Sequence, residues 1–302
     1  MPVPLFSIVI PTYNRRELLE ATLRSVWAQD SRDYEVIVVD DGSTDGTREF
    51  LAGQADRLVF IAQEHRGPGV ARNAAIARAT GEYVAFLDSD DLLMPWALST
   101  YAAVIARETR PAFICGAVRR FSDPAGLEGV QPAGLDAVSF RDYFASGDRM
   151  RWYGMSSFVL RREAVVAAGG FTTEPINGED FDLALRVGEA RGFVEVRSPV
   201  TVGYREHAGG FRHVADKTLA TLEFLWQQER QGRYPGGTVR SKERWRILTI
   251  PMRSNSVACL RGGQGEVAWR LYRRSFGWHL ALGRWKYLLG FPVMALFTRA
   301  RA

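Results

Sequence analysis

The sequence predicts an α/β fold: a Rossmann-like, mostly parallel central sheet flanked by helices, with a helical C-terminal extension. Three observations support this class. Apolar runs of strand length recur in the first 120 residues, helical patterns separate them, and two of the runs end in acidic turns. Strands that alternate with helices are typical of parallel sheets with right-handed crossovers. A chain of 302 residues can also bury a sizeable core.

The apolar runs predict five strands, at residues 6–10, 35–40, 58–62, 82–87 and 112–116. Two helices are expected between them, one presenting Leu19, Leu23 and Val26 on one face and one beginning near Gly69. Residues 123–136 are rich in Gly, Pro and Ala, which indicates an exposed loop. After it we expect a strand at 157–161, a helix that begins near residue 162 and a second helix at 180–191. Two further strands are expected at 193–196 and 200–205.

Three carboxylates follow the strand expected at 82–87, in the sequence Asp88-Ser89-Asp90-Asp91. Open α/β sheets bind ligands at this end of their strands. The carboxylates would repel one another unless a cation lay between them, and an Asp-x-Asp pattern can hold a hard cation through oxygen ligands. A second explanation is that Asp90 or Asp91 caps the helix that Pro95 helps to open.

A second acidic turn follows the strand at 35–40, with Asp40 and Asp41 before Gly42. The first strand ends in Pro11-Thr12-Tyr13-Asn14, which brings an aromatic ring to the same edge of the sheet. Ordinary turn chemistry explains either segment alone. Together they predict one site at this edge.

The net charge of +5 arises in the last part of the chain. Residues 265–302 contain seven Lys or Arg and one acid, together with three of the eight tryptophans, whereas the remainder is near neutral. A basic amphipathic helix with tryptophans suits an anionic membrane surface. The alternative is a helix packed on the rest of the chain with its arginines in solvent. Nucleic acid is not an expected partner, because no recognition motif accompanies the basic residues.

The cysteines, Cys115 and Cys259, are far apart and in apolar surroundings. They form no metal-type pair, which suits a reducing compartment. The first strand begins by Phe6 with no signal-like segment before it, and no apolar run reaches the ~20 residues of a spanning helix. We therefore expect a cytoplasmic protein, with peripheral attachment to the inner face of a membrane if the tail binds lipid.

These motifs resemble those of the family 2 glycosyltransferases of the GT-A fold, over about residues 5–210. The segments that carry the resemblance are Pro11–Asn14, Val39–Asp45, Gly69–Asn73, Gly81–Asp91, Gly169–Phe171 and Glu179–Arg186. The resemblance implies a GT-A catalytic domain over 1–215, with nucleotide-sugar binding in 1–116 and the acceptor side in 117–215. A helical, basic and aromatic region at 216–302 would follow it.

The resemblance also implies roles for individual residues. Asp90 and Asp88 would bind a divalent cation, Mn²⁺ or Mg²⁺, and His207 is a further expected ligand, with a solvent-exposed loop histidine as the alternative. Asp41 would contact uracil, with Tyr13 stacking on the base. The full set expected to bind the nucleotide is Pro11, Thr12, Tyr13, Asn14, Asp41, Arg72, Asp88, Ser89 and Arg205. For Arg72 the alternative is an exposed helix arginine paired to an acid.

By the same resemblance, Asp180 is the catalytic base and Glu179 its neighbour at the donor sugar or the acceptor. Asp180 would take the proton from an acceptor hydroxyl as its oxygen attacks the anomeric carbon opposite the leaving diphosphate, which inverts the configuration. Capping alone could explain one acid there, since negative charge is favourable at a helix N-terminus.

The expected function is therefore an inverting, metal-dependent glycosyltransferase. Its donor would be a UDP- or dTDP-linked sugar, because a carboxylate that accepts from a base N3–H favours uridine or thymidine over purines. Its acceptor would be a hydroxyl of a glycan or lipid-linked saccharide, in cell-surface polysaccharide or glycoconjugate synthesis. The alternative is a non-catalytic member that binds nucleotide or glycan. A dinucleotide-dependent dehydrogenase is disfavoured, since Pro11–Asn14 replaces the Gly-x-Gly-x-x-Gly turn.

Overall fold

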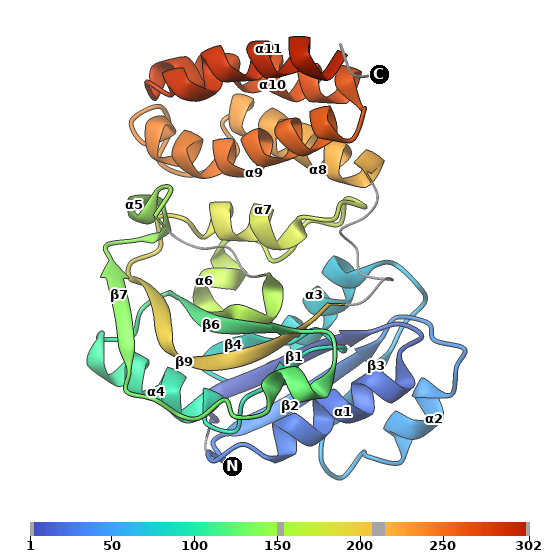
Figure 1. The fold of residues 1–302 in the computed structure, drawn as a ribbon. Helices are drawn as coiled ribbons and strands as arrows, with labels where there is room; N and C mark the ends of the chain where they lie inside the picture. Colours follow the sequence, from blue (N-terminus) through green and yellow to red (C-terminus); the bar gives the residue numbers. More distant parts are fainter. Residues whose placement is uncertain (1–2, 150–153, 207–214, 300–302) are drawn as a thin grey trace. The chain divides into compact units, whose positions relative to one another are not determined.

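The computed structural model describes residues 3–149, 154–206 and 215–299. The chain divides into two compact units (Figure 1). The sheet unit comprises residues 1–143, 152–175 and 190–210, and the helical unit comprises residues 144–151, 176–189 and 211–302. The domain boundary expected between residues 215 and 216 stays a prediction.

Four parallel strands form the first part of the sheet: β1 (Phe6–Thr12), β2 (Tyr34–Asp40), β3 (Val59–Ala62) and β4 (Tyr83–Phe86). Their order is β3-β2-β1-β4, and Ile8 of β1 lies opposite Val36 of β2 and Ala85 of β4. β1 and β4 are buried along their whole length, which explains why their sequences are almost continuously apolar. The first four predicted strands are confirmed.

The sheet becomes mixed beyond β4. β8 (Phe158–Arg161) pairs antiparallel with β4 and with β6 (Phe113–Phe121), and β6 pairs parallel with the long strand β9 (Phe193–Arg205). Two strands that the sequence does not predict, β5 (Leu92–Leu93) and β7 (Asp136–Phe140), pair antiparallel with β9. The two strands expected at 193–196 and 200–205 are one irregular strand, and the α/β class is confirmed.

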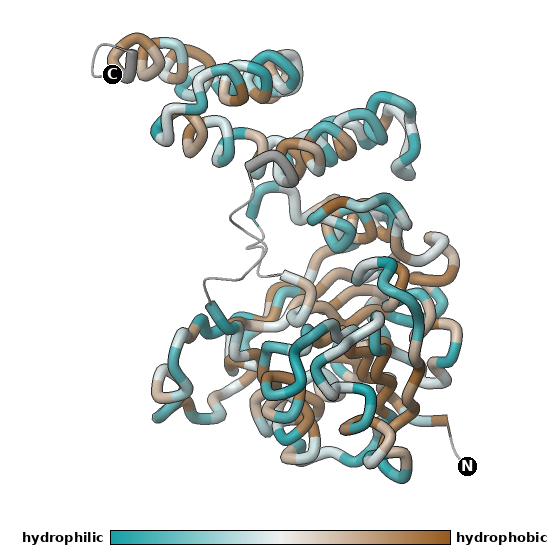
Figure 2. The backbone as a smooth tube through the Cα atoms, turned by 90° about the vertical axis from the view of Figure 1, so that its right-hand side faces the viewer, coloured by the Kyte–Doolittle hydropathy of each residue, from teal (hydrophilic) through white to brown (hydrophobic). Residues whose placement is uncertain are grey.

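Five helices of the sheet unit flank the sheet (Figure 1): α1 (Arg16–Trp27), α2 (Thr47–Ala52), α3 (Pro68–Arg78), α4 (Ala97–Arg107) and α6 (Arg162–Ala167). Leu19, Leu23 and Val26 of α1 form the predicted apolar face and pack in the same core as Ile8 and Ile10 of β1. In Figure 2, the tube is coloured hydrophobic along much of the sheet. The sheet thus provides a rigid base for the turns at its strand ends.

The helical unit contains α7 (Glu179–Arg186), α8 (Ala215–Arg230), α9 (Ser241–Arg261), α10 (Gly265–Ala281) and α11 (Trp285–Arg299), and α5 (Tyr143–Ser146) begins at its edge. Tyr272 of α10 and Phe291 of α11 stack at 4.6 Å within the small core that these two helices share with Leu260 of α9. Arg244 of α9 pairs with Glu229 of α8 at 2.6 Å, and both side chains are buried.

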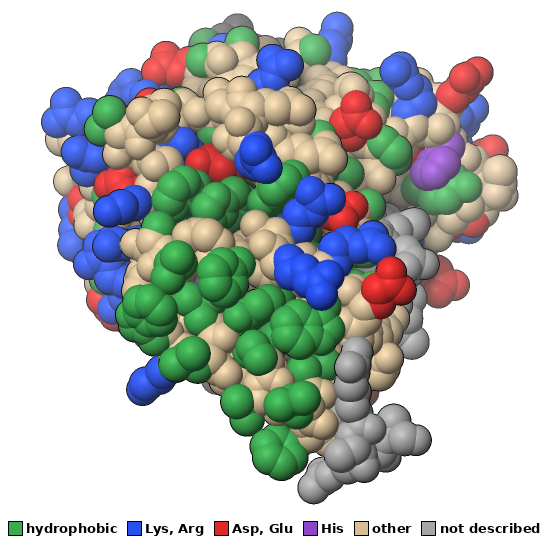
Figure 3. Space-filling view, turned by 90° about the horizontal axis from the view of Figure 1, so that it is seen from above, with side chains coloured by type: hydrophobic (Ala, Val, Ile, Leu, Met, Phe, Trp, Pro, Cys, Tyr) green, Lys and Arg blue, Asp and Glu red, His purple; other side chains and the backbone are tan. Residues whose placement is uncertain are grey.

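One face of the helical unit is seen in Figure 3, where many hydrophobic side chains reach the surface. Among the described helices, none combines the length and the apolar character that crossing a bilayer requires.

Candidate active site

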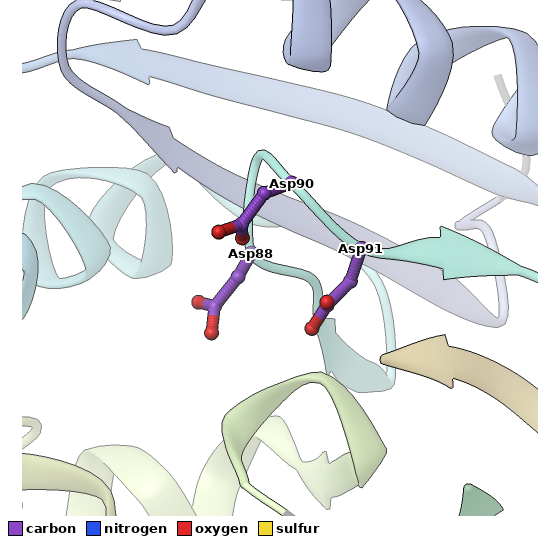
Figure 4. A group of neighbouring side chains, drawn as sticks. All are labelled: Asp88, Asp90 and Asp91. Atoms are coloured by element: carbon purple, nitrogen blue, oxygen red, sulfur yellow. The ribbon is translucent and has the colours of Figure 1, made fainter. Parts of the chain in front are cut away.

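The turn after β4 brings three carboxylates together (Figure 4). Carboxylate oxygens of Asp88, Asp90 and Asp91 all lie within 4.8 Å of one another. The backbone closes the turn with a hydrogen bond of 3.1 Å from the amide of Asp91 to the carbonyl of Asp88. Asp90 and Asp91 are buried, whereas the side chain of Asp88 is 29% exposed. Like charges this close in a partly buried turn require compensation by positive charge.

Three arginines from distant parts of the sequence contact this turn. Arg72 of α3 donates to Asp88 Oδ1 at 2.6 Å, and Arg15, just before α1, donates to Asp90 Oδ2 at 2.5 Å. Arg205, at the end of β9, donates from Nε to the carbonyl of Asp90 at 2.9 Å. Arg72 is only 3% exposed, so the alternative of an exposed helix arginine is wrong, although its pairing to an acid is observed.

Asp91 anchors the turn. Its two oxygens accept from the Ser156 hydroxyl at 2.6 Å and from the Arg205 amide at 2.8 Å, and Ser156 Oγ in turn accepts from the amide of Asp88. Burial raises the pKa of Asp91 well above its ordinary value, and the charges of Asp88 and Asp90 raise it further. The capping explanation is wrong for this residue, because α4 begins at Ala97 after Trp96, with no side-chain cap.

The donor set of the turn fits a hard divalent cation. All three side chains offer carboxylate oxygens, which Mg²⁺, Mn²⁺ and Ca²⁺ prefer. Asp91 is engaged by Ser156 and a backbone amide, so Asp88 and Asp90 are the residues that could turn toward a cation. To bind a cation, each of these two carboxylates would have to leave its present ion pair with an arginine. Ser89 is buried within the same turn.

A second group of expected residues lies at the ends of β1 and β2. Asp41 is 3% exposed, and its carboxylate accepts from the amides of Arg66 and Gly67 at 2.9 and 2.8 Å and from Gln63 Nε2 at 2.6 Å. His65 Nδ1 lies 2.9 Å from Asp41 Oδ2. Asp41 therefore holds the segment after β3 in place with a carboxylate whose acceptor positions are largely filled.

The ring of Tyr13 is 42% exposed and stacks on His65, with centroids 4.0 Å apart and planes at 24°. Beside it is an open pocket with a volume of about 620 Å³, lined by Gly42, Arg48, Ala62, Gln63, Glu64 and His65. Gln63 and His65 were missed by the sequence reasoning, since they lie in a coil segment without periodicity. The pocket is large enough for a heterocyclic base and a pentose.

The other residues of the first motif have mainly backbone roles. Asn14 adopts φ +51°. Its side-chain Oδ1 accepts a hydrogen bond from the backbone amide of Thr44 at 2.8 Å, and its backbone amide donates to Ser43 Oγ. These two bonds connect the turns that follow β1 and β2. Pro11 and Thr12 are buried beneath the turn, and the carbonyl of Thr12 accepts from the amide of Asp41.

Glu179 and Asp180 lie in the helical unit, in the first turn of α7 after Gly178. Both are partly buried, and Asp180 Oδ1 accepts from the amide of Phe181 at 2.7 Å. The third acid of this turn, Asp182, is 2% exposed and is held by Arg186 and by the Tyr234 hydroxyl, which is a structural arrangement. His207, expected as a metal ligand, lies outside the described residues.

Comparison with known proteins relates the chain to glycosyltransferases. Residues 7–166 match the family model described as glycosyl transferase family 2. A Bacillus subtilis protein, described provisionally as a teichuronic acid biosynthesis glycosyltransferase, is 48% identical over 93 residues, 29% of this chain and 36% of that protein. A Campylobacter jejuni GalNAc(5)-diNAcBac-PP-undecaprenol beta-1,3-glucosyltransferase is 40% identical over 103 residues, 32% and 33% of the two chains.

The chain thus spans about a third of the length of these relatives. Among solved structures, residues 1–349 of Staphylococcus aureus TarS, in complex with UDP-GlcNAc, superpose with a TM-score of 0.61 at 18% identity. The match covers 98% of this chain and 91% of that one. At this identity the similarity establishes the fold.

Proposed function

Because the chain belongs to glycosyl transferase family 2, we propose that it transfers a sugar from a nucleotide diphosphate donor to an acceptor hydroxyl, with inversion at the anomeric carbon. The observation that carries the proposal is the acidic turn of Asp88, Asp90 and Asp91, which is contacted by arginines from three distant parts of the sequence. Carboxylates suit a divalent cation, and the arginines suit phosphate oxygens. A nucleotide diphosphate with its cation presents both partners.

Asp90 and Asp88 would hold the cation, Mn²⁺ or Mg²⁺, which supplies charge neutralisation to the leaving diphosphate. If these carboxylates turned to it, their ion pairs with Arg15 and Arg72 would be broken. Their guanidinium groups are then available to diphosphate oxygens, together with Arg205. His207 is the further proposed ligand.

The pocket beside Tyr13 is proposed to bind the base. Tyr13 would stack on it, as it now stacks on His65. The base N3–H would donate to Asp41 in the position that His65 Nδ1 now occupies, because the other donors to Asp41 are mainly backbone amides and cannot easily leave. Uracil and thymine carry this N3–H beside two carbonyls, so a UDP- or dTDP-linked donor is favoured. The remaining proposed nucleotide contacts are Pro11, Thr12, Asn14 and Ser89.

Asp180 is the proposed base. It would accept the proton of the acceptor hydroxyl while the hydroxyl oxygen bonds to the anomeric carbon and the bond from that carbon to the diphosphate breaks. The proton ends on the Asp180 carboxyl and the electron pair of the broken bond on the diphosphate. Glu179 is the proposed neighbour that contacts the donor sugar or the acceptor.

The proposed acceptor is a glycan or a lipid-linked saccharide, in cell-surface polysaccharide or glycoconjugate synthesis. The names of the two relatives support this choice, since one refers to teichuronic acid and the other to an undecaprenol-linked saccharide. Such an acceptor would place the protein at the inner face of a membrane. A non-catalytic binding member is the alternative, and retention of Asp90 and Asp180 argues against it.

A thermal-shift screen against nucleotide sugars, with Mn²⁺ and with EDTA, tests the proposal. Uridine or thymidine donors should raise the melting temperature with Mn²⁺ only, and Asp90→Asn should abolish the shift. Asp56→Asn is the matched control, because Asp56 is an exposed acid of the sheet unit. A shift confined to purine donors, or one that persists in EDTA, would contradict the proposed site.

A further inference from the structure

Two consecutive helices of the helical unit expose an unusual number of large apolar side chains. Among the described residues, eleven such side chains are exposed, and seven of them lie on α10 and α11. They are Phe276, Leu280, Trp285, Leu289, Val293, Leu296 and Phe297, here called the α10–α11 patch. Figure 3 shows hydrophobic side chains gathered on this face, with Lys and Arg along its edge. Exposed apolar surface of this extent marks an interaction site.

α11 is apolar on both of its sides. Tyr287, Leu288 and Phe291 are buried in the small core shared with α9 and α10. On the opposite side, Leu289 and Leu296 are 68% and 69% exposed. Lys286 is the one charged residue between Trp285 and Phe297. A helix that is hydrophobic all round is normally enclosed, so the exposed side requires an apolar partner.

The charge around the patch identifies the kind of partner. No Asp or Glu occurs in residues 267–302, whereas six Lys or Arg do so before Arg301. Arg270 lies 3.8 Å from Glu223 and 3.5 Å from Glu266, and Arg274 lies 3.9 Å from Glu223; long, solvent-exposed pairs of this kind are weak. A second copy of this chain would bring the same positive surface against itself, which opposes self-association. Anionic headgroups offer the complementary charge.

The length of α11 decides how a bilayer would be engaged. Its 15 residues span about 22 Å at the usual rise per residue, which is less than the ~30 Å of a bilayer core, and Pro292 lies inside it. We propose that α10 and α11 dock in the plane of a bilayer containing anionic lipid, with the residues of the α10–α11 patch other than Trp285 among the acyl chains. Trp285 and Lys286, at the start of α11, would lie at headgroup level.

This docking surface contains none of the residues assigned to sugar transfer. Its failure would therefore leave the proposed function intact, and the reverse also holds. Removal of the whole segment 265–302 would be a poor test, because Tyr272, Tyr287 and Phe291 form the core of these helices. Substitutions confined to exposed side chains preserve that core.

Vesicle sedimentation of the full chain tests the proposal. The vesicles are phosphatidylcholine containing a minor share of phosphatidylglycerol, compared with phosphatidylcholine alone. The wild type should bind the anionic vesicles at least about tenfold more tightly. Leu289→Ser with Leu296→Ser should weaken binding by roughly a hundredfold, since each leucine leaves the acyl region. Val239→Ser is the control: Val239 is 92% exposed and lies outside both helices, so binding should be unchanged.

Lys286→Glu is a second variant with an intact apolar surface, and it should weaken binding to anionic vesicles by about tenfold while leaving binding to neutral vesicles unchanged. Circular dichroism verifies that each variant keeps its helices. Equal sedimentation of the wild type and the double variant would overturn the proposal. So would light scattering that shows a dimer dissociated by the double substitution in a protein that binds no vesicles, which would make the patch a self-association surface.

Discussion

The guanidinium of Arg15 lies 2.5 Å from Asp90 Oδ2, although the two residues are 75 positions apart in the sequence. The carboxylate proposed to bind a metal is therefore held by a cation of the protein itself. The pair is partly exposed, with 26% of the Arg15 side chain and 12% of the Asp90 side chain accessible. A metal that binds there as proposed would compete with Arg15, and the displaced arginine would then be close to the proposed diphosphate.

Arg15→Gln should consequently separate metal binding from nucleotide binding. Without nucleotide, Mn²⁺ affinity should rise by about fivefold, because a partly exposed ion pair worth about 1 kcal/mol no longer has to be broken. With Mn²⁺ present, UDP affinity should fall. Calorimetry measures both, and Arg16→Gln, at the exposed neighbouring position, is the control of equal charge. A weaker Mn²⁺ affinity in Arg15→Gln would show that Arg15 supports the metal site.

Asp180→Asn should retain donor affinity and lose sugar transfer by roughly two to four orders of magnitude, since the amide cannot accept the hydroxyl proton. Rates of transfer and calorimetric affinities should be measured on the same preparation. Asp182→Asn is an unsuitable control because Asp182 is bonded to Tyr234 and Arg186. Glu174→Gln, on an exposed position before α7, should leave turnover unchanged. Normal turnover of Asp180→Asn would reject Asp180 as the base.

His279 of α10 is fully buried, and neither ring nitrogen has a hydrogen-bond partner among the described residues. Burial, with a smaller effect of Arg284 and Arg253, lowers the pKa of His279 from 6.5 to about 3. Between pH 6.5 and pH 3, His279 therefore binds a proton in the unfolded chain but stays neutral in the native chain. The contribution of neutral His279 to the free energy of unfolding is complete above pH 6.5 and decreases as the pH falls toward 3.

Between pH 6.5 and about pH 5, this histidine should reduce the free energy of unfolding by about 1.5 kcal/mol. His279→Leu should remove that part of the pH dependence with little loss at neutral pH. Urea unfolding, followed through helical circular dichroism at both pH values, measures it. His65→Gln is the control: the side chain of His65 is 55% exposed, and this variant should show the same decrease in the free energy of unfolding with pH as the wild type. Identical pH profiles of the wild type and His279→Leu would contradict this account.

Gly116 of β6 is enclosed by a buried hydrogen bond. A Cβ there would lie 2.2 Å from Tyr101 Oη and 2.4 Å from Thr201 Oγ1, and these two hydroxyls are 2.9 Å apart. Gly116→Ala should therefore destabilise the sheet unit by about 1 to 3 kcal/mol in urea unfolding. Gly134→Ala is the control, since nothing lies within 4 Å of its added Cβ. Equal stability of the two variants would show that the strand can shift.

The sequence was sufficient to predict the parallel half of the sheet. β1, β2 and β4 are apolar because both of their faces are buried, and such runs are visible without tertiary information. The acidic turn after β4 was found for the same reason, since its place follows from the strand. β7 escaped prediction because it is short and only partly buried, and the segments expected as two strands at 193–196 and 200–205 are joined through Pro199 in the single strand β9.

The contacts of the arginines with the acidic turn were only partly predicted. Arg72 and Arg205 were expected to bind the nucleotide, on the basis of the resemblance, but not to contact the acidic turn through Asp88 and the carbonyl of Asp90. These partners are 16 and 115 residues away in the sequence, and hydrophobic periodicity does not indicate contacts of this kind. Arg15 immediately follows the first motif, but nothing in its spacing points to Asp90. The bonds of Asp41 to the segment after β3 were missed for a related reason, because coil segments give no pattern.

Calorimetry of UDP binding tests the central claim, that the turn after β4 binds a nucleotide diphosphate through a divalent cation. The wild type should bind UDP in the presence of Mn²⁺ and lose at least about tenfold in affinity in EDTA. Asp90→Asn should bind UDP equally weakly in both conditions, and Asp56→Asn should match the wild type. UDP affinity that is the same with Mn²⁺ and with EDTA in the wild type would contradict the claim.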